Sequence, residues 1–330
     1  MDYLLTSLRY FKIENYKEST LFPNDMDKGN FTLLNNSRGD LERILKSYGY
    51  LENFGLVHLN TVKDNFACVV IYNDCPADQS IRTQEMHIHY MKTKYFAMSL
   101  WFIKDNSVLP YVTTITSDKV IPPQILRNTA YYTCSDGVIK DVSFTYDDIK
   151  EAEYWVEVLT THAIKISGER EIKSDKVENI SLFPYSETTS LSRALLYLDI
   201  ARKETFLPSK IASYITILEI LCAVNGENTY KVSERVAALL GGNSDEKMNL
   251  FYSVKKAYDF RSKFVHGSHI NYQDVSKVSE ISIELDEIVR NVLKKIVKEH
   301  TNLIYSNKKK QGFSNFEAVD KEFINIVLNN

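Results

Sequence analysis

From residue 1 to about 145, the chain combines short apolar or alternating runs with turn residues, a pattern typical of β-strands. Three runs carry this pattern most clearly: FACVVIYND (66–74), YFAMSLWFI (95–103) and YVTTITSD (111–118). Pro122 and Pro123 follow the third run and are expected to prevent regular strand pairing just beyond it. We therefore predict a mostly antiparallel β region with helical insertions.

The hydrophobic period changes at Thr145. A threonine followed by Asp147 and Asp148 is typical of a helix start, and apolar residues three and four apart follow it. This pattern predicts a helix near 146–165. The segment LFPYSETTS (182–190) is predicted to be a joint, because it combines a proline with hydroxyl-rich capping residues.

Almost everything after this joint has a helical period. The predicted helices are 194–201, 209–224, 230–240, about 245–266 and about 274–305. Pro208 is placed to open the second of them, while Asn225-Gly226, Gly241-Gly242 and Gly267 are placed to end the second, third and fourth. The predicted fold class is α+β, with a mostly β domain at 1–186 followed by an all-α bundle at 187–330.

The charge of the chain limits its partners. With 40 Lys and Arg against 43 Asp and Glu, the net charge of −3 excludes a protein that coats nucleic acid through uniform positive charge. Basic residues still gather on two predicted helices. They are Lys247, Lys255, Lys256, Arg261 and Lys263 on the fourth helix, and Arg290, Lys294 and Lys298 on the fifth. Such faces are either simply solvated or contact a polyanion.

Several other classes lack their sequence signals. There is no Gly-rich phosphate loop and no Gly-x-Ser-x-Gly turn, so no nucleotide cofactor and no serine hydrolase are expected. His87 and His89 would share one face of a strand, but no third metal ligand lies near them in sequence. The four cysteines are scattered, and no apolar run is long enough to span a membrane. We expect a cytoplasmic protein with buried, reduced thiols, without metal or membrane partner.

The most informative segment is AYDFRSKFVHGSH (257–269), in which Arg261 precedes His266 by five residues at a predicted helix end. Together with ITILEIL and SERVAALL, it resembles the HEPN superfamily of helical ribonucleases, in particular its Apea-like branch. The resemblance covers only the C-terminal domain. It implies a helical bundle that cleaves RNA, with two copies of the Arg and His joined in one composite site of a homodimer.

The chemistry of the two residues agrees with RNA cleavage. Histidine exchanges protons near neutral pH, and arginine keeps the positive charge that a phosphate needs in the transition state. We expect His266 to be a general acid or base and Arg261 a phosphate clamp. Since RNA carries its own 2′-hydroxyl nucleophile, no metal is required, DNA is not cut, and the product is a 2′,3′-cyclic phosphate.

Five further residues are candidate supporting or RNA-binding residues: Glu219, Lys255, Lys256, Ser262 and Lys263. Glu219 either orients Arg261 or points to solvent. Five residues turn an ideal helix by about 500°, so Arg261 and His266 are about 140° apart. Either the last turn is distorted, or a second subunit completes the site.

The favoured hypothesis is a metal-independent endoribonuclease. The resemblance implies a toxin of antiviral defence or abortive infection, controlled by a regulatory or sensing N-terminal domain. The alternatives are a HEPN-like module that binds RNA, nucleotide or protein without cleaving, and a purely structural role.

Overall fold

The computed structural model describes residues 2–15, 19–21, 31–36, 38–72, 75–117, 120–163, 189–222, 228–265, 272–304 and 315–329. The chain divides into two compact units. The first comprises residues 1–132 and 139–158, and the second comprises residues 133–138 and 159–330. The division falls inside a helix, 28 residues before the boundary at 186 that the sequence analysis placed in the joint.

The first unit is built on a six-stranded antiparallel sheet with the strand order β3-β4-β5-β1-β6-β7. Its strands are β1 Asp2–Arg9, β3 Ser19–Leu21, β4 Phe31–Leu34, β5 Phe66–Tyr72, β6 Leu109–Ser117 and β7 Val120–Arg127. A short parallel pair joins β2 Phe11–Ile13 to β8 Val142–Phe144. The strands predicted around 66–74 and 111–118 are thereby confirmed as β5 and β6.

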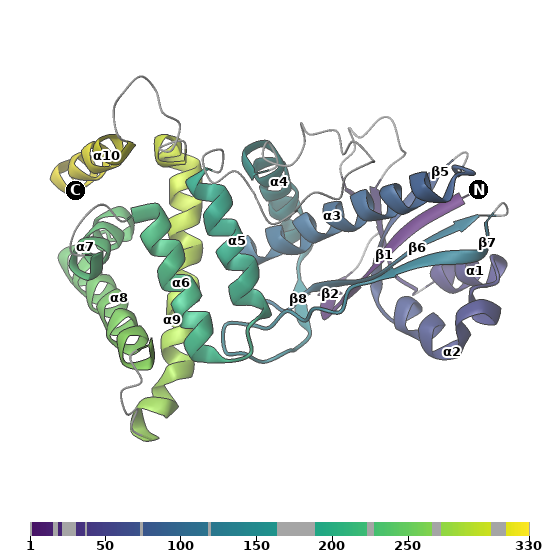
Figure 1. Ribbon diagram of the computed structural model, residues 1–330, viewed down its shortest axis with the longest axis horizontal. Helices are drawn as coiled ribbons and strands as arrows, with labels where there is room; N and C mark the ends of the chain where they lie inside the picture. The colour runs from purple at the N-terminus through teal and green to yellow at the C-terminus, as the bar shows by residue number, and fades with distance from the viewer. Residues whose placement is uncertain are drawn as a thin grey trace. The chain divides into compact units, whose positions relative to one another are not determined.

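Helices cover both faces of this sheet (Figure 1). They are α1 Asp40–Ser47, α2 Tyr50–Lys63, α3 Gln79–Ile103 and α4 Tyr146–Ala163. In β5, Cys68 and Val70 pack toward α3 and α4, while Ala67 and Val69 pack toward α1 and α2. Successive side chains of a strand point to opposite faces of the sheet, and helices cover both faces, so both sides of β5 are buried.

The predicted strand at 95–103 is wrong. These residues form the C-terminal end of α3, a 25-residue helix whose N-terminal amides at Ser80 and Ile81 are capped by the Asp78 carboxylate. All residues from Phe96 to Phe102 are buried. A helix that is buried all round has no polar stripe, so its apolar run looks like a buried strand in the sequence.

Two further expectations for this unit need correction. His87 and His89 lie on α3 rather than on a strand, where residues two apart do not share a face; His87 is exposed and His89 is buried. The expectation for Pro122 and Pro123 is confirmed, because they lie within the edge strand β7 where its pairing with β6 is irregular, between the pairs Ile115–Gln124 and Ser117–Val120. The helices also contain more residues than the strands, so the unit is α+β and not mostly β.

The second unit is helical, in agreement with the prediction. Its elements are α5 Ser190–Lys203, α6 Leu207–Cys222, α7 Asn228–Leu240, α8 Ser244–Val265, α9 Tyr272–Glu299, the 3-10 turn η2 Thr301–Leu303 and α10 Asn315–Asn329. The central helix α6 packs against α5, α7, α8 and α9 (Figure 1). Helix α10 was not predicted from the sequence, although Val319, Phe323 and Ile326 follow a helical period and are buried.

Local signals set most helix starts. Thr145 and Asp148 exchange hydrogen bonds between side chain and backbone at the start of α4, as expected for a capping box. The Thr189 hydroxyl caps α5, and Pro208 occupies the first turn of α6. Asn225-Gly226 and Gly267 lie outside the described residues. No helix in the described part of the chain is both long and apolar enough to cross a membrane.

Candidate functional site

Helix α8 carries most of the candidate residues, and residues at its N-terminal end cap its first turn. The Asn243 side chain accepts a hydrogen bond from the Glu246 amide, and the Glu246 carboxylate accepts hydrogen bonds from the amides of Gly242 and Asn243. This reciprocal capping satisfies the first turn of α8. Val254, Ala257, Tyr258 and Phe260 then form the buried side of the helix.

Glu219 of α6 brings two residues of α8 together. Its Oε1 accepts a hydrogen bond from Arg261 Nη1 at 2.8 Å and another from the Tyr258 hydroxyl at 3.2 Å. The Glu219 and Arg261 side chains are 22% and 30% exposed, so the ion pair lies at the edge of the bundle. Of the two alternatives for Glu219, the structure shows the contact with Arg261.

Tyr258 is held in its neutral form by this arrangement. Burial raises the pKa of the Tyr258 hydroxyl, and the negative charge and hydrogen bond of Glu219 raise this pKa further, against an opposing effect of Arg261. Tyr258 therefore stays a hydrogen-bond donor to Glu219 across the physiological pH range. The carboxylate is fixed from two directions, and it fixes the arginine in turn.

Arg261 keeps binding capacity after this pairing. A guanidinium has five N–H donors, and within the described residues Arg261 has Glu219 as its one hydrogen-bond acceptor. The remaining donors form a partly exposed, oriented positive group. A phosphate or carboxylate is the ligand that such a planar group binds best.

The other predicted site residues do not all meet at this point. Ser262, Lys263, Lys255 and Lys256 are exposed on α8. His266 lies outside the described residues, so its relation to Arg261 stays a prediction.

The basic face predicted on the last long helix is interrupted. Arg290 is 11% exposed and forms an ion pair with Asp286, which is itself buried and accepts a hydrogen bond from the Tyr214 hydroxyl at 2.7 Å. Arg290 therefore belongs to the interior of the bundle and is not part of a surface that contacts a polyanion. The i, i+4 spacing of Asp286 and Arg290 places the two side chains within reach of each other on one helix, but it does not show that they are buried.

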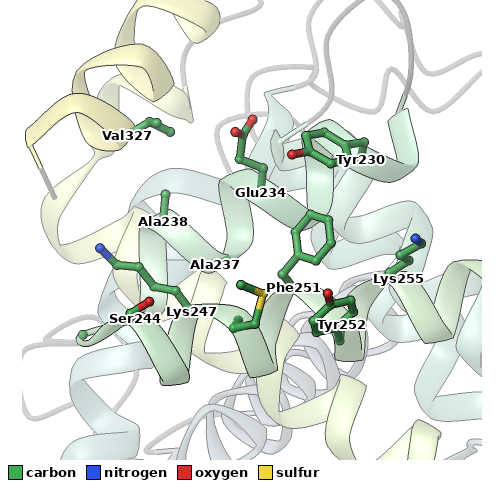
Figure 2. A pocket seen from close by; sticks show the side chains of 12 residues that line it. Tyr230, Glu234, Ala237, Ala238, Ser244, Lys247, Phe251, Tyr252, Lys255 and Val327 are labelled. Carbon is green, nitrogen blue, oxygen red and sulfur yellow. The ribbon is translucent and has the colours of Figure 1, made fainter.

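A cavity of about 800 Å³ between α7, α8 and α10 was missed by the sequence analysis (Figure 2). It is lined by Tyr230, Glu234, Ala237, Ala238, Gly242, Ser244, Lys247, Met248, Phe251, Tyr252, Lys255 and Val327. Of the predicted supporting residues, only Lys255 takes part. The signal in the sequence is the spacing of Lys247, Met248, Phe251, Tyr252 and Lys255, which follows one side of a helix.

His89 and the four cysteines are buried titratable groups away from this site. His89 donates from Nε2 to the Cys68 carbonyl at 3.0 Å, and burial lowers its pKa to about 4. All four cysteines are buried thiols, and burial raises the pKa of Cys222 to about 12. Burial also raises the pKa of the Cys68 thiol, so neither Cys68 nor Cys222 is a nucleophile at neutral pH.

Comparison with known proteins supplies no family for this chain: no family model, no curated protein and no solved structure matches it.

Proposed function

We propose that this protein is a metal-independent endoribonuclease of the HEPN type. The observation that carries the proposal is the ion pair between Glu219 and Arg261, which holds a partly exposed guanidinium on α8 five residues before His266 in the sequence. A positive group that is oriented in advance stabilises growing negative charge on a phosphate without reorganisation during the reaction. The helical bundle agrees with the fold that the resemblance implies.

The proposed reaction uses the 2′-hydroxyl of RNA as the nucleophile. His266 takes the proton from this hydroxyl or gives one to the leaving 5′-oxygen, and Arg261 binds the non-bridging phosphoryl oxygens. The bond between phosphorus and the 5′-oxygen breaks as the bond to the 2′-oxygen forms. The products are a 2′,3′-cyclic phosphate and a 5′-hydroxyl.

The proposal includes a homodimer formed through the helical unit. Arg261 and His266 are about 140° apart on an ideal helix, so one straight helix does not direct both side chains to one phosphate. A two-fold axis beside α8 would let each phosphate meet the Arg261 of one subunit and the His266 of the other. As a cellular role we propose a toxin of antiviral defence or abortive infection, with the first unit as its regulatory or sensing part.

Cleavage of RNA in the presence of EDTA tests the proposal directly. The wild-type chain should cut RNA but not DNA of the same sequence, and its products should end in a 2′,3′-cyclic phosphate. Arg261→Ala and His266→Ala should each abolish cleavage, whereas the control Lys277→Ala, an exposed lysine on α9, should retain it. Equal cleavage by all three variants would refute the assignment of the site.

The second candidate function is RNA binding without cleavage. The cavity between α7, α8 and α10 favours it, because this cavity offers aromatic rings and lysines away from Arg261. A protein of this kind would bind RNA with an affinity that falls steeply with salt and would release no product under any condition.

A further inference from the structure

The cavity between α7, α8 and α10 combines three kinds of side chain that are not used by the proposed cleavage site. Aromatic rings form its centre, lysines lie on both sides of them, and one carboxylate lies at its rim (Figure 2). Its volume of about 800 Å³ falls within the range of ligand-binding cavities in proteins.

The aromatic rings are arranged to contact a flat ligand. The Phe251 ring packs edge to face against Tyr230 and Tyr252, with centroid distances of 5.3 and 5.5 Å. Phe251 is half-buried, whereas Tyr230 and Tyr252 are 58% and 57% exposed. The rings of both tyrosines are therefore supported from within and accessible from outside. Every nucleobase has a π-face that stacks on such rings.

The lysines supply positive charge at the two ends of the aromatic group. Lys247 and Lys255 lie on opposite sides of Phe251 in Figure 2 and are separated by about 12 Å along α8, the rise of eight helical residues. Lys255 is exposed and has no carboxylate partner among the described residues. The lysine side chains are long and flexible, so their ammonium groups can converge on the more closely spaced phosphates that flank one nucleotide of a strand.

The carboxylate adds a preference among bases. Glu234 is exposed and lies beside Tyr230 on α7 (Figure 2). A carboxylate only accepts hydrogen bonds, so it favours a base with adjacent N–H donors on its Watson–Crick edge. Guanine has two such donors, at N1 and N2, whereas adenine has an acceptor at N1.

The same side of α8 leads from the cavity toward the proposed cleavage site. Lys255 and Ser262 are seven residues apart, so they lie on one side of the helix about 10 Å from each other. Ser262 and Lys263 directly follow Arg261 in the sequence, and both are exposed. Arg261 is next to Ser262 in sequence but about 100° away around the helix, so a strand that occupies the cavity reaches Arg261 by turning around α8 at Ser262.

We infer that this cavity binds one unpaired nucleotide of an RNA strand, preferably guanosine. Tyr230 and Tyr252 stack on the base, Glu234 accepts hydrogen bonds from it, and Lys247 and Lys255 bind the flanking phosphates. The inference rests on the proposed function, because that function makes an RNA strand the ligand that supplies the nucleotide. By holding one nucleotide in place, the cavity would determine which phosphate of the RNA lies at Arg261.

Binding of a short single-stranded oligonucleotide to the full-length protein tests this inference. The probe carries one guanosine among uridines and 2′-O-methyl groups throughout, so it has no nucleophile and is not cleaved. Tyr252→Ala should weaken binding by at least about fivefold, as alanine substitution does at base-stacking aromatics. The control Tyr154→Ala, an exposed tyrosine of the first unit, should not weaken it.

Salt dependence tests whether Lys255 binds a phosphate. For a single strand, the slope of log affinity against log salt concentration decreases by about 0.7 for each phosphate that the protein no longer neutralises. Lys255→Ala should reduce the slope by this amount, and the control Lys277→Ala should leave it unchanged. Replacing the guanosine of the probe with adenosine should weaken binding to the wild type but not to Glu234→Gln.

Three outcomes would overturn the inference. The first is binding that Tyr252→Ala and Lys255→Ala change no more than their controls do. The second is free guanosine monophosphate that binds as tightly as the oligonucleotide, which would make the cavity a mononucleotide site. The third is no binding of the oligonucleotide at all. If the wild type binds the probe as expected but cuts no RNA, the nuclease proposal fails while the cavity assignment stands.

Discussion

Replacing Glu219 with alanine should both destabilise the helical unit and disable Arg261. The substitution removes the oxygen that accepts hydrogen bonds from Arg261 and from the Tyr258 hydroxyl. Tyr258 is 7% exposed, so its hydroxyl loses its partner at a place that water reaches poorly. Arg261 keeps its charge but loses the hydrogen bond that orients it.

The cost follows from these two losses. Leaving a buried hydroxyl without a partner costs about 1–3 kcal/mol, and a hydrogen bond to a charged group contributes about 1.5–3 kcal/mol. The contribution of Arg261 is at the low end, because its side chain is 30% exposed and water replaces part of the interaction. We expect Glu219→Ala to lower the free energy of unfolding by about 3 kcal/mol.

Two variants separate stability from positioning. Tyr258→Phe removes one donor and leaves the ion pair intact, so it should cost about 1 kcal/mol and leave RNA cleavage unchanged. Glu219→Gln keeps a carbonyl acceptor for Arg261 and should retain most of the cleavage. Glu219→Ala should reduce the turnover number at least about tenfold, because a displaced group loses its alignment with the reacting phosphate.

Urea unfolding monitored by two signals measures the stability change. Both tryptophans of the chain, Trp101 and Trp155, lie in the first unit, whereas circular dichroism at helical wavelengths reports on both units. Glu219→Ala should shift the circular dichroism transition and leave the tryptophan transition unchanged. If Glu219→Ala costs no more than Tyr258→Phe and cleaves RNA equally well, the positioning role of Glu219 is refuted.

The remaining predictions concern stability in both units. Asp286→Ala should cost about 3–5 kcal/mol in urea unfolding, because it removes the buried carboxylate that pairs with Arg290 and accepts a hydrogen bond from Tyr214; a cost below about 1 kcal/mol would contradict this. Burial lowers the pKa of His89 to about 4 from 6.5, so the unfolded chain binds a proton that the folded chain excludes between these pH values. The first unit should therefore lose about 3 kcal/mol as the pH falls through this window. His89→Gln should flatten the pH dependence of tryptophan-monitored unfolding, and an unchanged curve would refute the assignment. Thr145→Ala should cost about 1 kcal/mol in the same assay through loss of the α4 cap, whereas Thr145→Ser should not.

The candidate site was only partly predictable from the sequence. Glu219 and Lys255 were identified from residue type and position, and Arg261 was identified from its place in the motif at 257–269. That Glu219 and Arg261 contact each other was left open, because they lie on different helices 42 residues apart. The position of His266 stays a prediction.

The errors have a common physical cause. The C-terminal end of α3 was predicted as a strand because periodicity reports which side of an element faces solvent, and this segment has no such side. Arg290 was counted with a basic face because charge in a sequence does not reveal burial. Only packing against α6, through Tyr214 and Asp286, places it inside the bundle.

The sequence alone determined the features that depend on neighbouring residues: most helices of the second unit, two central strands of the sheet, and the cap at Thr145. These features result from backbone hydrogen bonding and side-chain period over a few residues. Only the tertiary structure decided which charges are paired and where a cavity forms. Both depend on side chains that chain folding brings together from helices far apart in sequence, such as Tyr230 of α7, Tyr252 of α8 and Val327 of α10.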